Sequence, residues 1–136
     1  MRRRGSCRYG RLALLVAAAI GTAAIGGCRS ASPMSADPKR EVPGGDADRG
    51  KRDIAAFGCG SCHTIPGVRG AKGLVGPPLI KFARRTFIAG EVPNTAEYLV
   101  RWIEMPQAIE PGTAMPNLGV SEGRARDIAA YLYTLR

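Results

Sequence analysis

The stretch Cys59-Gly60-Ser61-Cys62-His63 decides the fold of this 136-residue chain. Two cysteines separated by two residues and followed at once by a histidine form a C-x-x-C-H motif, which is typical of covalent haem attachment. Each cysteine sulfur adds to one vinyl group of the haem and forms a thioether, and the two-residue gap matches the spacing of the vinyl groups. The motif therefore predicts one haem c, attached through Cys59 and Cys62, with His63 as an iron ligand.

Three other kinds of site use similar residues, and each fits this chain less well. A redox C-x-x-C site needs a thioredoxin-like βαβ context, and the sequence has no such pattern. A zinc site needs about four ligands, and two cysteines with the only histidine of the chain leave it short. A structural disulfide is possible in an exported protein, but it leaves the adjacent His63 unexplained.

An iron held by His63 needs a sixth ligand, and the chain has four methionines, Met1, Met34, Met105 and Met115. The first two lie in segments that we assign to export and tethering. Met115 lies in a loop that Pro111 and Pro116 restrict, which suits a thioether held against iron. Any methionine can instead fill a core gap. We assign Met115 to the iron and Met105, which ends an expected helix, to packing.

The first 27 residues have the organisation of a secretory signal peptide. Five arginines precede an apolar run from Leu12 to Ile25, which is shorter than the roughly 20 residues of a membrane span. The segment Ile25-Gly26-Gly27-Cys28 resembles a bacterial lipobox, in which the cysteine is lipidated. We therefore expect export to the bacterial periplasm and a membrane tether at Cys28. An uncleaved anchor helix, or cleavage that leaves Cys28 unmodified, is the alternative.

Charge and composition argue against one kind of partner and against two fold classes. The chain has 20 basic and 11 acidic residues, a formal charge of +9. Without residues 1–27, fifteen basic residues remain against eleven acidic ones, a charge of +4. Because no interleaved aromatic residues accompany these charges, we expect no nucleic-acid partner. The 18 glycines and 10 prolines argue against a long coiled coil or a large sheet sandwich. Aromatic residues are only 6%, so a bound group could fill the interior.

Residues 28–45 are small and polar and predict a flexible tether, so we place the domain at residues 46–136. Asp46 or Asp48 can cap a first helix whose apolar stripe includes Gly50. Gly50 costs roughly 1 kcal/mol of helix propensity relative to alanine, so it indicates either close approach by another helix or tolerance near a frayed helix end. Residues 58–78 predict a loop, and residues 79–87 predict a short helical segment.

Two further helices follow. Asn94 can cap one of them, with Glu97 in a capping box, and Pro106 ends it. The last helix begins at Ser121, and its charged residues, Asp127 included, are expected mainly on the solvent face. No strand alternation stands out. The sequence therefore predicts an all-α domain with two long loops.

Taken together, residues 46–136 resemble a class I, mono-haem c-type cytochrome. The matching positions are spread over the whole domain: Gly50, Cys59, Cys62, His63, Gly76, Pro77, Leu79, Pro106, Pro111, Gly112, Thr113, Met115 and Tyr131. The resemblance implies the cytochrome c fold, with three to five helices wrapped around one covalent haem. It also implies that the first and last helices cross near Gly50, and that the Pro77 carbonyl accepts a hydrogen bond from His63.

More narrowly, the chain is similar to the cytochrome c domain fused to subunit II of some haem–copper oxidases. That likeness rests on 62–67, 76–79, Arg85, 89–90, 93–94 and 102–103. No copper-binding cupredoxin domain precedes the haem domain, so we expect a separate, lipid-tethered version. Arg85, Asn94 and Trp102 are candidates to pack around the haem or to bind its propionates. Their alternatives are surface charge, a helix cap and a core aromatic.

His63/Met115 ligation implies a closed, six-coordinate iron, which suits an electron carrier rather than an enzyme. Expected partners are a quinol-oxidising complex as donor or a terminal oxidase as acceptor. A haem-based ligand sensor or catalytic subunit, in which Met115 is displaced, is the alternative function, and a structural subunit with an internal haem relay is a third. Basic residues after the motif either dock such partners or form an ordinary solvated face: Arg69, Lys72, Lys81, Arg84 and Arg85.

Overall fold

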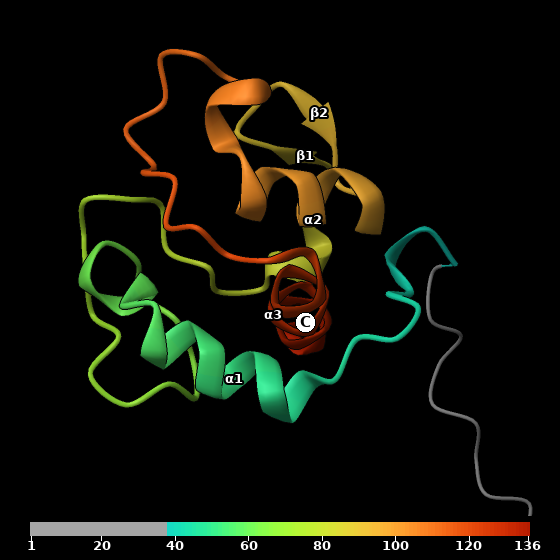
Figure 1. Ribbon diagram of the computed structural model, residues 1–136. Coiled ribbons are helices and arrows are strands. Elements are labelled where there is room, and N and C mark those ends of the chain that lie inside the picture. Colours follow the sequence, from blue (N-terminus) through green and yellow to red (C-terminus); the bar gives the residue numbers. More distant parts are fainter. Residues whose placement is uncertain (1–37) are drawn as a thin grey trace, which may run out of the picture. The chain divides into compact units, whose positions relative to one another are not determined.

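The computed structural model describes residues 38–136, and three α-helices carry most of its regular structure (Figure 1). The helices are α1 (Ala47–Ala56), α2 (Ala96–Glu104) and α3 (Glu122–Thr134). Four 3-10 turns accompany them: η1 (Pro38–Arg40), η2 (Cys59–Ser61), η3 (Phe82–Arg84) and η4 (Pro106–Ala108). The expected signal peptide, Cys28 and Met34 lie outside the described residues. Among residues 38–136, no helix has the length and apolar character needed to span a bilayer.

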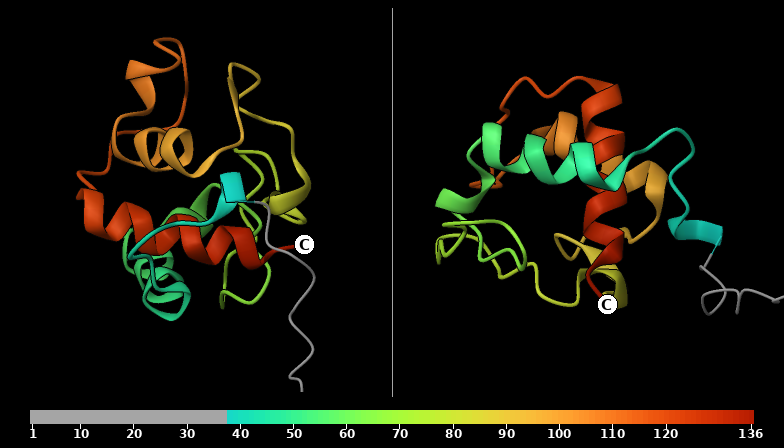
Figure 2. Two further views of the ribbon diagram at one scale, coloured as in Figure 1. Left: turned by 90° about the vertical axis from the view of Figure 1, so that its right-hand side faces the viewer. Right: turned by 90° about the horizontal axis from the view of Figure 1, so that it is seen from below.

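The first and last helices cross, as the resemblance implied (Figures 1 and 2). Gly50 of α1 is buried at this crossing, and a Cβ atom on it would lie 1.9 Å from the Asp127 carbonyl oxygen of α3. The predicted close approach at Gly50 is therefore confirmed. The Asp46 side chain caps α1 by accepting a hydrogen bond of 2.8 Å from the Arg49 N–H. That prediction is confirmed as well.

Asp127 is not on the solvent face as expected, but is 6% exposed beside the crossing. Arg49 of α1 donates two hydrogen bonds to its carboxylate, of 2.7 and 3.0 Å. The Asp46 N–H donates a third, of 2.7 Å. The hydrogen bonds from Arg49 hold the pKa of Asp127 below its usual range. The expectation was wrong because periodicity within α3 cannot show a cation reaching across from α1.

The expected short helical segment over residues 79–87 is confirmed only in part, because the 3-10 turn η3 covers just Phe82–Arg84. Lys81, at the start of η3, has a left-handed backbone with φ of 52°. Beyond η3, β1 (Phe87–Ile88) pairs antiparallel with β2 (Val92–Pro93), with Phe87 opposite Pro93. Ala89 and Gly90, both at positive φ, turn the chain between the strands. Strands of two residues are too short to show an alternating pattern in the sequence.

The cap of α2 is Thr95, not Asn94, and its hydroxyl accepts a hydrogen bond from the Tyr98 N–H. Glu97 is then one position too close to the cap to form the predicted capping box. Asn94 is instead buried, and its amide donates to the carbonyls of Phe82 and Arg85 at 3.2 and 3.0 Å. Its side-chain oxygen accepts a hydrogen bond from the Tyr133 hydroxyl. Pro106 ends α2 as predicted, and Ser121 precedes α3 as predicted.

The expected tether is wrong for residues 38–45, which contact the domain. Arg40 donates a hydrogen bond of 3.1 Å to the Arg85 carbonyl, and Arg126 of α3 donates one of 3.3 Å to the Pro43 carbonyl. Val42 packs against the core. Gly45 is so close to α3 that a Cβ atom on it would lie 2.7 Å from the Arg126 carbonyl oxygen. Composition alone misses such docking because backbone carbonyls accept both of these hydrogen bonds.

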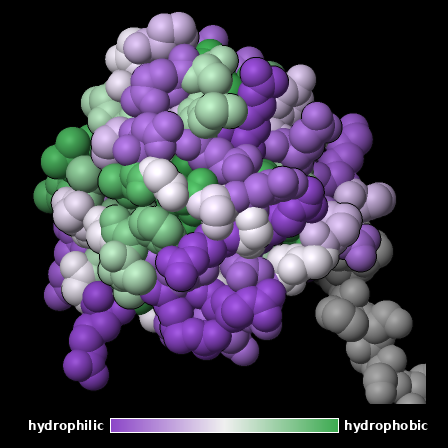
Figure 3. Space-filling model, in the orientation of Figure 1, coloured by the Kyte–Doolittle hydropathy of each residue, from purple (hydrophilic) through white to green (hydrophobic). Residues whose placement is uncertain are grey.

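The core is small and draws on every helix. Its most buried large side chains include Ile54 of α1, Leu99 of α2 and Pro106 of η4. Figure 3 shows apolar residues gathering on one side of the molecular face, over the loops that follow α1 and α2. The α1 side of the same face is hydrophilic. The apolar side leads to the cavity described next.

Candidate functional site

One cavity of about 560 Å³ contains the motif residues and Met115. A volume of this size is typical of ligand and cofactor sites, which span roughly 300–1,000 Å³. Most of its lining is apolar and comes from all three helices and both long loops. The lining includes Ile54, Phe57, Ile65, Leu79, Phe82, Ile88, Leu99, Ile103, Val120, Ile128 and Leu132. The three helices therefore converge on a space that their side chains do not fill.

The two motif cysteines lie on the wall of this cavity, in and just after η2. Gly58, with a φ of 71°, turns the chain sharply from α1 into η2. Both thiols are free, and burial raises the pKa of the Cys59 thiol. Within residues 38–136, no three His, Cys, Asp or Glu side chains are grouped to hold a metal ion. The wall thus presents two unbridged thiols, and it lacks the ligand set of a zinc site.

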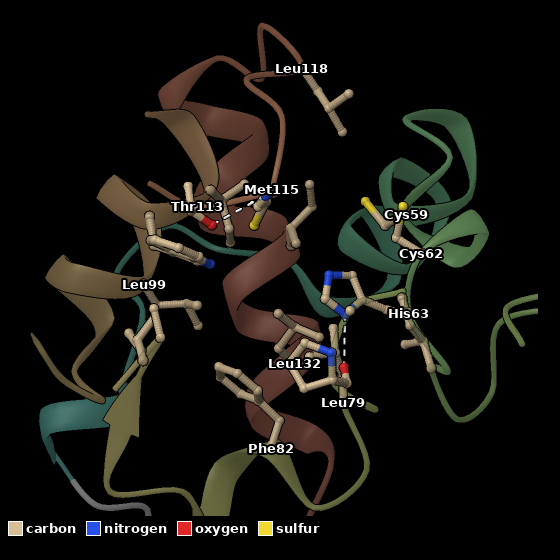
Figure 4. A pocket seen from close by; sticks show the side chains of 18 of the residues that line it. Cys59, Cys62, His63, Leu79, Phe82, Leu99, Thr113, Met115, Leu118 and Leu132 are labelled. Atoms are coloured by element: carbon tan, nitrogen blue, oxygen red, sulfur yellow. Dashed lines mark hydrogen bonds between the residues drawn. The ribbon is translucent and has the colours of Figure 1, made fainter. Parts of the chain in front are cut away.

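His63 is fixed with one ring nitrogen facing the cavity. Its Nδ1 lies 2.8 Å from the Pro77 carbonyl oxygen, which confirms the predicted partner. A carbonyl can only accept, so Nδ1 carries the proton and Nε2 keeps its lone pair for a metal. Figure 4 shows His63 and the two cysteines on one side of the cavity and Met115 on the other.

Gly76 explains how the loop can lie so close to the ring. A Cβ atom at this position would lie 2.3 Å from His63 Cε1, so any larger residue would displace the ring or the loop. The Gly76 N–H also donates a hydrogen bond of 2.8 Å to the Cys62 carbonyl. In the sequence, Gly76 was only one element of a resemblance, and the structure supplies its physical reason.

Met115 enters the cavity from the loop between η4 and α3. Its N–H donates to the Thr113 hydroxyl at 3.2 Å, and its carbonyl accepts from the Gln107 amide at 2.8 Å. Met105 does not line the cavity and is 51% exposed, so its expected role in packing is wrong. Gln107 was not among the predicted site residues, because no pattern in the sequence distinguishes it from other exposed polar residues.

The remaining predicted site residues divide into two groups. Arg85 and Trp102 line the cavity. The Arg85 guanidinium lies 5.4 Å from the centre of the Phe82 ring, donates to the Pro78 carbonyl, and has a pKa lowered by burial. Asn94 does not line the cavity, and its amide is already hydrogen-bonded. Asn94 fastens η3 and α3, and its expected contact with the cofactor stays a prediction.

The basic residues after the motif are mostly at the surface. Four of them are exposed, Arg69, Lys72, Lys81 and Arg84, and Arg85 is half-buried at the cavity. Large apolar side chains are exposed in the same part of the chain, with Leu74 at 86% and Val75 at 79%. Val75 also lines the cavity.

The chemistry of the cavity fits a covalently bound haem. Two thiols stand on one wall, and one imidazole nitrogen is free for iron on the same side. A thioether lies on the opposite side, and the walls between are apolar. Arg85 supplies a cation at the edge, where the propionates of a haem could be neutralised.

Comparison with known proteins agrees with this geometry. A family model described as Cytochrome c matches residues 47–136. The chain is also similar to "Cytochrome c oxidase subunit 2" of Alkalihalophilus pseudofirmus (strain ATCC BAA-2126 / JCM 17055 / OF4), with 33% identity over 91 residues. The match covers 66% of this chain and 26% of that protein. This chain therefore corresponds to about a quarter of the relative's length.

Proposed function

Because this chain belongs to the cytochrome c family, we propose that it is a mono-haem electron carrier of a respiratory chain. Membership of the family implies covalent haem c and electron transfer. In the proposed site, Cys59 and Cys62 attach the haem, and His63 and Met115 coordinate its iron. When bound, the haem supplies a reversible one-electron change at the iron.

The observation that carries this proposal is the placement of His63 and Met115 on opposite sides of one apolar cavity (Figure 4). A histidine nitrogen and a thioether sulfur together favour a high reduction potential. Both ligands belong to segments held by hydrogen bonds, so neither needs to leave when the iron changes oxidation state. This arrangement suits electron transfer better than chemistry that needs an open iron position.

The other residues of the site each have a proposed task. Pro77 fixes the tautomer of His63 and orients its ring. The apolar walls exclude water, which strengthens the electrostatic interactions inside the cavity. The positive charge of Arg85 offsets the negative charge of the propionates and favours the reduced state.

We propose export to the periplasm, with residues 1–27 removed and a lipid on Cys28. The supporting features are the basic and apolar segments and the lipobox-like sequence. Two or more acyl chains anchor a protein stably, whereas one chain binds a bilayer only marginally. Residues 29–37 would then link the lipidated Cys28 to the domain, because residues 38–45 pack on the domain.

The proposed partners are a quinol-oxidising complex as electron donor and a terminal oxidase as acceptor. The printed name of the relative, an oxidase subunit, supports the second. The exposed basic and apolar residues in the stretch after the C-x-x-C-H motif support short-lived docking, because complementary charge raises the encounter rate.

The attachment is tested by expression in a host that attaches haem c to exported proteins. After denaturation, mass spectrometry should show one haem per chain in the wild type, because thioethers survive unfolding and iron–ligand bonds do not. The Cys59→Ala/Cys62→Ala double variant should lose the haem under the same treatment. A wild-type polypeptide that is secreted and free of haem would overturn the proposal.

The same preparation separates a carrier from a ligand sensor or catalyst. A closed iron should bind carbon monoxide slowly or not at all in the reduced protein. Fast, saturating carbon monoxide binding by the wild type would favour the function of a ligand sensor or catalyst, in which Met115 is displaced from the iron.

A further inference from the structure

Met115 lies in a loop that has little packing of its own. Most residues from Pro111 to Gly119 are exposed, and Met115 itself is half-buried. Yet a metal ligand must keep its position within a fraction of an ångström. Side-chain hydrogen bonds to the backbone of Met115 take the place of packing here.

Both peptide groups of Met115 are bound by side chains. Its N–H donates to Thr113 Oγ1 at 3.2 Å, and its carbonyl accepts from Gln107 Nε2 at 2.8 Å. Thr113 is only two residues away, so its bond shapes a local turn. Gln107 is eight residues away and lies in η4, so its bond ties the loop to the end of α2.

The backbone next to Gln107 is held by packing and by hydrogen bonds. Pro106, directly before it, is less than 2% exposed and belongs to the core. The Pro106 carbonyl accepts hydrogen bonds from Ile109 and Glu110, at 3.1 and 3.0 Å. The Met105 N–H continues α2 by donating to the Arg101 carbonyl at 2.9 Å. The backbone at Gln107 is therefore held in place. The hydrogen bond from the Gln107 amide in turn restricts the movement of Met115.

We propose that Gln107 is a positioning residue for the axial ligand Met115. The hydrogen bond from its amide to the Met115 carbonyl holds the loop so that the thioether stays inside the cavity. This inference rests on the proposed function, because it takes Met115 as the iron ligand. It adds a determinant of how strongly Met115 competes with other ligands for the iron.

Only a donor of suitable length can fill this role. Alanine at position 107 would remove the hydrogen bond and leave the exposed surface otherwise intact. Glutamate has the same length, but its carboxylate would face the Met115 carbonyl and repel it above the ordinary glutamate pKa of about 4.3. Gln107→Glu should therefore loosen the loop at neutral pH more than Gln107→Ala.

The test is an imidazole titration of the oxidised holoprotein, since imidazole binds iron by displacing Met115. Wild type, Gln107→Ala, Gln107→Glu and the control Met105→Ala are compared. We expect roughly 2- to 10-fold tighter imidazole binding in Gln107→Ala, as for the loss of one neutral hydrogen bond. Gln107→Glu should bind imidazole more tightly still. Met105→Ala should match the wild type, because Met105 is exposed in the same part of the fold but does not line the cavity.

The long-wavelength charge-transfer band of thioether-ligated ferric iron, recorded without imidazole, separates the ligand assignment from the positioning role. If the wild type lacks this band, Met115 is not the ligand, and the proposed site falls together with the inference. If the band is present but the Gln107 variants bind imidazole like the wild type, Gln107 has no positioning role. An equal shift in Met105→Ala would also overturn the inference, because it would indicate a general loosening near α2.

Discussion

Replacing Gly50 by alanine should force the first and last helices apart. The new Cβ would lie 1.9 Å from the Asp127 carbonyl oxygen and 2.8 Å from the Ile128 nitrogen, both backbone atoms of α3. Because no side-chain rotation can relieve a clash with backbone, α1 must move by about 1 Å. Overpacking of this kind costs about 1–3 kcal/mol, and alanine returns roughly 1 kcal/mol of helix propensity. We therefore expect a net loss of up to about 2 kcal/mol relative to the wild type.

Urea unfolding followed by circular dichroism measures this loss in the holoprotein. In thermal unfolding, a loss of 1 kcal/mol in the free energy of unfolding corresponds to a drop in Tm of about 4–8 °C for a domain of this size. Gly123→Ala is the matched control, because Gly123 lies in α3 and a Cβ on it meets nothing within 4 Å. Gly123→Ala should leave stability unchanged or raise it. A Gly50→Ala protein as stable as Gly123→Ala would refute the close backbone contact at the helix crossing.

The remaining predictions concern charge and attachment. Because Arg49 depresses the pKa of Asp127, this carboxylate stabilises the fold above its unfolded pKa of about 3.9 and loses that contribution as the pH falls through its lower folded value. In Asp127→Asn, the free energy of unfolding should fall less steeply as the pH decreases than in the wild type. An unchanged dependence at acid pH would contradict the role of the ion pair. Arg85→Gln should lower the reduction potential, because a positive charge of the cavity lining that favours the reduced state is lost. Redox titration checks this, and a raised potential would be inconsistent with it. Cys28→Ser should release the protein from membranes or leave its signal uncleaved, whereas a cleaved chain that stays on the membrane would indicate a protein anchor.

The local features that the sequence predicted well are those that a single residue type enforces. Gly50 stood in an apolar stripe where only close helix contact makes glycine favourable, and the structure places it at the crossing. The spacing of Cys59, Cys62 and His63 matches the chemistry of haem attachment, and the structure places all three on the wall of one cavity. Prolines restrict the loop of Met115, and the structure places Met115, but not Met105, at the same cavity.

The features that the sequence did not predict depend on contacts between distant segments. Asn94 looked like a cap, but the carbonyls of η3 and the Tyr133 hydroxyl offered it better partners. Asp127 looked solvent-exposed until Arg49 reached it from α1. No pattern in the sequence indicated a role for Gln107, since its partner is a backbone carbonyl eight residues away. No local pattern records which donor meets which acceptor across the fold.

The assignment of the iron to His63 and Met115 is tested most directly by carbon monoxide binding to reduced Met115→Ala and Met105→Ala holoproteins, with the reduction potential measured on the same samples. We expect Met115→Ala to bind carbon monoxide quickly and to have a lower potential, because the thioether that favours ferrous iron is gone. Met105→Ala should behave like the wild type in both measurements. The reverse result, with Met105→Ala opening the iron and Met115→Ala leaving it closed, would contradict this assignment.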